Sequence, residues 1–224
     1  MGQLLTANSA TNLYWLGRYL ERINGLLTYM MPVYDECIDI DKEAGKKLYK
    51  GFSIEIEYEN ASDFLTVAMF GDHNSNVAML AEYARENAII CRNYINTEAF
   101  GEVIELYNML QNAAKNHHEI DYRLINNALS LISEIWGEVF KVSKSSISDH
   151  FLRLGRLIER LDFHLRFHGH DEHALNLSDQ INGTIGFLAS YDATVQEKST
   201  QMTMDSKTDI IETMHAKVQS LIVE

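Results

Sequence analysis

Proline is almost absent from this chain, with Pro32 as the single example among 224 residues. The proline ring removes an amide donor and clashes with the preceding helical turn, so long helices exclude it, whereas chains of short strands and turns use it freely. The scarcity therefore predicts an all-α protein. Pro32 follows a long apolar segment, and we expect the first helix to stop there.

Cysteines and long hydrophobic runs are also scarce. The two cysteines, Cys37 and Cys91, are far apart in the sequence and have no metal-ligand spacing, which is typical of a reducing compartment. No stretch approaches the length of a membrane span, and the N-terminus lacks a basic segment followed by an apolar one. These absences predict a cytoplasmic protein that has no membrane partner.

Basic charge is low as well. The chain has 19 lysines and arginines against 32 acidic residues, a net charge of -13, and no basic run. Binding to a phosphate backbone needs a concentrated basic surface, so we expect no nucleic acid partner. The sequence also has no glycine-rich phosphate loop, nucleophile elbow or HExxH motif, so we expect no cofactor and leave open whether the chain is an enzyme.

Hydrophobic residues follow a helical period over most of the chain. Hydrophobic residues recur at spacings of three and four, which indicates helices that pack into a single multi-helix bundle, one domain over residues 1–224. Residues 35–60 are expected to form an irregular or short helical connector, because the alternating segment 52–59 has no second strand to pair with. The expected helices cover residues 10–31, with Ser9 as N-cap, then 62–70, 76–95, 97–115, 121–142, 148–168, 176–195 and 205–223, with a loop at 196–206.

A seven-residue motif occurs twice in otherwise apolar helices. Leu-Gly-Arg-Tyr-Leu-Glu-Arg at 16–22 reappears as Leu-Gly-Arg-Leu-Ile-Glu-Arg at 154–160. Gly17 costs about 1 kcal/mol relative to alanine inside a helix, so it indicates close approach of another backbone or of a ligand. A buried Arg–Glu pair that loses one partner costs about 3–5 kcal/mol. We therefore expect Glu21 to meet an arginine of the second helix and Glu159 an arginine of the first.

Two interpretations of this charged cluster remain open. It is either a buried ion-pair lattice that fixes the register of the helices, or a pocket in which surplus arginines bind a carboxylate or phosphate. Its candidate binding residues are Arg18, Glu21, Arg22, Arg85, Glu86, Arg156, Glu159 and Arg160.

Two helical segments and a block of three short stretches between them resemble the bacterial alpha-E family. Leu13 to Arg22 and Phe151 to Asp162 are similar to its two signature helices. Between them lie Asn-Ser-Asn-Val at 74–77, Ala-Arg-Glu-Asn-Ala at 84–88 and Ile-Asn-Thr-Glu at 95–98, in the family's order. Residues 49–60 and everything after His170 match weakly.

The resemblance implies a helical fold and an association with ATP-grasp ligases and transglutaminase-like proteins, in systems thought to make or modify peptides by amide-bond formation. We therefore expect an accessory module with such a protein as partner and a peptide or carboxylate as ligand. An enzyme that uses the Arg/Glu cluster on a carboxylate-bearing substrate, and a purely structural dimerising bundle, are the alternatives.

A histidine-rich segment is the last candidate site. His164 and His168 lie one helical turn apart, and Asp162, His170, Asp171, Glu172 and His173 are close in sequence. A metal site needs three or four converging ligands, and we expect residues from His170 onward to leave the helix at Gly169. We therefore predict no bound metal.

Overall fold

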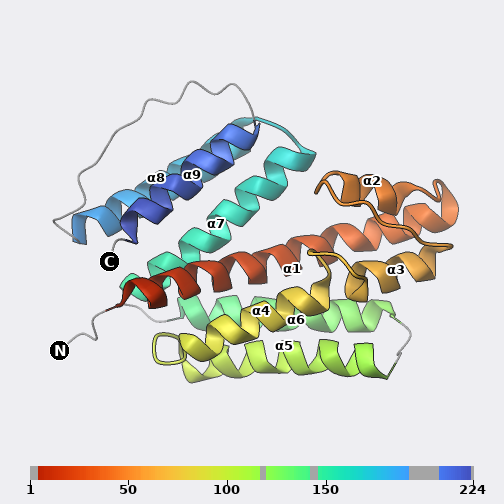
Figure 1. Cartoon of the computed structure of the whole chain (residues 1–224), viewed down its shortest axis with the longest axis horizontal. Coiled ribbons are helices and arrows are strands. Elements are labelled where there is room, and N and C mark those ends of the chain that lie inside the picture. Colours follow the sequence, from red (N-terminus) through yellow and green to blue (C-terminus); the bar gives the residue numbers. More distant parts are fainter. Residues whose placement is uncertain (1–4, 117–119, 142–145, 192–206, 223–224) are drawn as a thin grey trace. The chain divides into compact units, whose positions relative to one another are not determined.

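The computed structural model describes residues 5–116, 120–141, 146–191 and 207–222 of the chain. Over these residues it contains nine α-helices and no strand, which confirms the all-α prediction (Figure 1). None of the described helices is long and apolar enough to cross a membrane. The helices are α1 (Ala7–Asp39), α2 (Ala44–Lys50), α3 (Ala61–Phe70), α4 (Val77–Ile90), α5 (Thr97–Lys115), α6 (Tyr122–Phe140), α7 (Ile147–Phe167), α8 (Glu172–Tyr191) and α9 (Lys207–Leu221).

The chain divides into two compact units. Residues 1–18 and 144–224 form one, here called the terminal unit, and residues 19–143 form the other, the central unit. The division falls within α1, between Arg18 and Tyr19. That the whole chain behaves as a single domain stays a prediction.

The central unit is built on a run of antiparallel helices. Helix α4 packs against α5 and α5 against α6, side by side in Figure 1. Asparagines at 60, 76 and 96 cap α3, α4 and α5, each side chain accepting a hydrogen bond from the amide three residues later. Asn96 also donates to the carbonyl of Glu138 at 2.7 Å, which fixes the start of α5 against α6.

In the terminal unit α7 packs against both α8 and α9. A capping box between Ser146 and Asp149 starts α7. The helix ends before Gly169, whose φ of +85° suits a residue without a Cβ, so the prediction that the helix ends there is confirmed. Asp171 then accepts from the amide of Ala174 and caps α8.

Helix α1 corrects two predictions. It does not stop at Pro32 but continues to Asp39. Pro32 and Thr28 are both exposed, so water can replace the amide donor that proline removes from the Thr28 carbonyl. The N-cap is Thr6 rather than Ser9, since the Thr6 hydroxyl accepts from the Ser9 amide at 3.1 Å.

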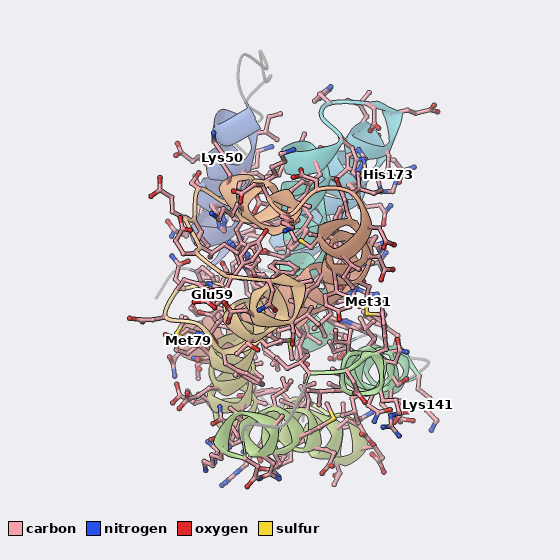
Figure 2. All side chains as sticks on the ribbon, turned by 90° about the vertical axis from the view of Figure 1, so that its right-hand side faces the viewer. Met31, Lys50, Glu59, Met79, Lys141 and His173 are labelled. Carbon is pink, nitrogen blue, oxygen red and sulfur yellow. The ribbon has the colours of Figure 1, made fainter. Side chains whose placement is uncertain are left out.

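Elsewhere the predicted boundaries shift by a few residues. The connector contains the short helix α2, which ends at Lys50. The segment from there to Glu59 begins with a hydrogen-bonded turn and forms no strand with any described residue (Figure 2). Helix α4 stops at Ile90 rather than 95, and α8 begins at Glu172 rather than 176. The predicted end of α8 at 195 and the loop at 196–206 lie outside the described residues.

Candidate functional site

The two repeated motifs contain the point at which α1 and α7 touch. A Cβ added to Gly17 would lie 2.1 Å from the carbonyl oxygen of Leu152, and one added to Gly155 would lie 2.0 Å from that of Tyr14. Each glycine therefore receives the backbone of the opposite helix. The prediction that Gly17 marks a close backbone approach is confirmed.

One buried ion pair spans this crossing. Nε and Nη2 of Arg18 approach the same oxygen of Glu159, Oε2, at 2.8 and 2.6 Å. The two side chains are only 9% and 1% exposed, so the pair is shielded from solvent. The predicted contact of Glu159 with an arginine of the first helix is confirmed. Glu21 is buried too, and its pairing with an arginine of α7 stays a prediction.

Two other predicted arginines lie in the central unit. Nη2 of Arg22 donates to the buried hydroxyl of Ser75 at 3.1 Å, and its guanidinium lies 5.5 Å from the ring centroid of Phe52. The guanidinium of Arg85 lies 4.9 Å from the ring centroid of Tyr107. These two arginines therefore have different neighbours from Arg18.

The remaining predicted residues differ in exposure. Arg156 is half-buried, whereas Glu86 and Arg160 are exposed. Of the eight candidates, the structure brings Arg18 and Glu159 together in the terminal unit.

Three residues that sequence reasoning missed also surround Arg18. Nη1 of Arg18 lies 2.5 Å from Nε2 of His215 in α9, and the other ring nitrogen, Nδ1, lies 2.9 Å from the hydroxyl of Tyr14. Trp15 stacks on the imidazole with ring centroids 6.3 Å apart, and the Arg18 guanidinium lies 5.1 Å from the Trp15 ring centroid.

The tautomer of His215 follows from these contacts. A guanidinium can only donate, so Nε2 accepts from Arg18 and Nδ1 carries the ring proton. Nδ1 therefore donates to the Tyr14 oxygen, and the phenol's own hydrogen stays available to an acceptor.

Burial sets the charges at neutral pH. Burial, the largest single influence, would lower the pKa of Arg18, but Glu159, Tyr14 and Asp162 together outweigh it and the pKa rises. Burial raises the pKa of Tyr14 to about 12, although Arg18 opposes the shift. Burial, with help from Arg18, lowers the pKa of His215 to about 4. The cluster thus holds one cation between a carboxylate and a neutral imidazole.

We expect the contact between α9 and Arg18 to weaken as the pH falls from about 6.5 toward 4. A free histidine takes up a proton in this window while the bound one does not, so the bound state loses stability as the pH falls. Arg18 of α1 opposes protonation of the ring, and Asp162 of α7 favours it. An NMR titration of the His215 ring tests this, with His215→Gln as the variant that lacks the transition. Titration of His215 near pH 6.5 in the folded protein would contradict it.

The histidine-rich segment forms a separate cluster at the start of α8, where Figure 2 labels His173. Nε2 of His164 lies 2.7 Å from Asp171, and the His168 and His173 rings lie 5.0 and 4.8 Å from the His164 ring. Asp162 instead accepts from Nε of Arg166 at 2.9 Å. Among the described residues no group of three or more histidine, cysteine or acidic side chains is arranged to hold a metal ion. That the purified protein contains no metal stays a prediction for elemental analysis.

Cys91 is buried, and burial raises the pKa of its thiol to about 12. The thiolate, not the thiol, is the nucleophile, so this cysteine is poorly suited to covalent catalysis. In the terminal unit, the Arg18 cluster presents a desolvated guanidinium that has the uncharged ring of His215 as one of its partners.

One family model matches this chain. It is the model of the Alpha-E family, described as a predicted alpha-helical domain with a conserved ER motif, and it covers residues 5–210. Glu-Arg pairs stand at 21–22 and 159–160, one in each repeated motif. His215 lies beyond the matched range. No curated protein and no solved structure matches the chain.

Proposed function

The chain belongs to the Alpha-E family, and from that premise we propose that it is an accessory module of an ATP-grasp amide-ligase system. In this proposal the module binds a carboxylate of the peptide that the system makes or modifies, and Arg18 is the residue that receives it. The ligase context rests on the family resemblance of the sequence, whereas the choice of Arg18 rests on its geometry.

The observation that supports a carboxylate site is that the nitrogens of the Arg18 guanidinium have unequal acceptors, one charged and one neutral. Two of its nitrogens share one oxygen of Glu159, while Nη1 donates to the uncharged ring of His215. A carboxylate adds a full negative charge to the acceptor, which the neutral imidazole lacks, and its two oxygens match the planar fork of a guanidinium. A ligand carboxylate would therefore be a better acceptor for Nη1 than the imidazole.

Part of the cluster is exposed. Trp15 is 37% exposed and His215 is half-buried, although Arg18 itself is only 8% exposed. A ligand can therefore approach along the Trp15 and His215 rings. Such partly open sites combine a desolvated charge with an aromatic wall.

A thermal-shift screen of glutamate, aspartate, short acidic peptides and nucleotides tests the anion site. A ligand present at a hundredfold excess over its dissociation constant should stabilise the fold by about 2.7 kcal/mol. Arg18→Met should abolish the shift, while Arg153→Met, which removes an exposed arginine of α7, should keep it. A purely structural lattice predicts that no ligand shifts the wild type and that Arg18→Met simply melts lower.

The ligase partner requires its own test. Tagged protein expressed in the native host should co-purify with an ATP-grasp ligase or a transglutaminase-like protein, identified by cross-linking and mass spectrometry. Recovery of neither under conditions that retain known complexes would overturn the ligase context. The anion site would then be judged by the ligand screen alone.

A further inference from the structure

Helix α9 contributes His215 to the Arg18 cluster. Ile210, Met214 and Val218, spaced by four, are at most 4% exposed and form the apolar side of α9 in the terminal unit. His215 follows Met214 and bonds to Arg18 and Tyr14, both on α1. Docking of α9 thus brings an imidazole to the guanidinium.

We propose that His215 stands in for a ligand carboxylate, so that α9 covers the Arg18 site in the free protein and is displaced when a carboxylate binds. This inference rests on the proposed anion site at Arg18 and adds how that site is closed and what opens it. The ligand class is a carboxylate, from either an acidic side chain or a chain terminus.

The shape of the imidazole supports this substitution. Its two nitrogens are separated by one carbon atom, as are the two oxygens of a carboxylate, and here they bridge Arg18 Nη1 and the Tyr14 hydroxyl. A carboxylate in the same place would accept from the same two groups. Tyr14 now accepts from Nδ1, but its hydroxyl can rotate and donate instead. Burial keeps the phenol protonated, so that proton is available.

The strength of the hydrogen bond to Arg18 also favours a carboxylate over the imidazole. A neutral ring accepting from a guanidinium is replaced by a charged acceptor, which strengthens the bond to Nη1. Displacing α9 costs the apolar contacts that it makes near His215. The apparent affinity for the ligand equals the affinity of the open site multiplied by the fraction of molecules in which the site is open. Weakening the contact of His215 should therefore raise the ligand affinity.

The test uses the full chain with Trp136→Phe, which leaves Trp15 as the only tryptophan. Two probes separate the ligand sources: N-acetylglutamic acid α-amide carries only a side-chain carboxylate, and N-acetylalanine carries only a terminal one. The matching amide of glutamine is the neutral control. We expect the fluorescence emission of Trp15 to change when one of the acidic probes binds, because the His215 imidazole then no longer stacks on the Trp15 ring.

Two variants distinguish a ligand that displaces α9 from one that binds without displacing it. His215→Ala should bind the acidic probe at least about tenfold more tightly than the wild type, because the closed state no longer competes. His150→Ala is the matched control: His150 is half-buried in the same unit and packs on Phe187, with ring centroids 4.1 Å apart, so its loss should leave the affinity unchanged. In the wild type, saturating probe should also return the pKa of His215 toward its ordinary value, and this readout does not depend on any variant's folding.

Two failures are distinguishable. If the probe binds wild type and His215→Ala equally, depends on Arg18 and leaves the pKa of His215 unchanged, then the anion site stands and the covering role of α9 is overturned. If neither acidic probe binds wild type or His215→Ala, the proposed anion site itself fails.

Discussion

Replacing Gly17 by alanine should destabilise the protein by about 3 kcal/mol, the upper end for overpacking a tight contact. The added Cβ would lie 2.1 Å from the carbonyl oxygen of Leu152 and 3.2 Å from the amide nitrogen of Arg156. Both atoms belong to backbone, so no side-chain rotation relieves the clash and the helices must separate. In an isolated helix the same substitution would stabilise by about 1 kcal/mol.

The effect should be reciprocal, because a Cβ on Gly155 would lie 2.0 Å from the carbonyl oxygen of Tyr14. Urea denaturation of both single variants and the double variant measures it. The second substitution should cost less than the first, since the helices are already apart.

The control is an alanine at Gly101 or Gly137, which are exposed helical positions where a Cβ meets no atom within 4 Å. These variants should gain up to about 1 kcal/mol. A Gly17→Ala protein as stable as these controls would show that the two helices do not cross at their glycines.

This crossing was accessible to sequence reasoning because glycine is costly inside a helix. A repeated glycine in two apolar helices needs a compensating contact, and the position four residues later lies on the same helix face. Glu159 stands four residues after Gly155 and is buried, whereas its neighbour Arg160 lies about 100° further round the helix and is exposed. Treating the whole motif as one buried cluster therefore included an exposed residue, Arg160.

Other features depend on tertiary structure and leave no local signal. Helix α1 passes through Pro32 because the carbonyl that loses its donor belongs to an exposed turn, and exposure is set by what packs around the helix. His215 meets Arg18 across 197 positions of sequence, from a helix with no motif of its own. The sequence could predict that Arg18 and Glu159 belong to the site, but it could not predict that His215 does.

Replacing Glu159 by methionine should cost about 3–5 kcal/mol, because it leaves the Arg18 cation buried without its carboxylate. The matched control is Glu57→Met, which breaks a pair of similar length, 2.8 Å to Lys46, at a carboxylate that is 87% exposed. Exposed pairs contribute at most about 1 kcal/mol, so the control should be nearly neutral. A cost for Glu159→Met no larger than that of the control would contradict the buried pair.

The double variant Arg18→Met/Glu159→Met separates the two interpretations of the cluster. Burying two methionines avoids the desolvation of both charges, so the double variant should recover most of the stability lost by Glu159→Met. If it recovers that stability and folds normally, the ion pair is not required for folding. If it also loses the thermal shift that the ligand induces in the wild type, the buried charges bind the ligand. An ion pair that only sets the register of the helices is then ruled out.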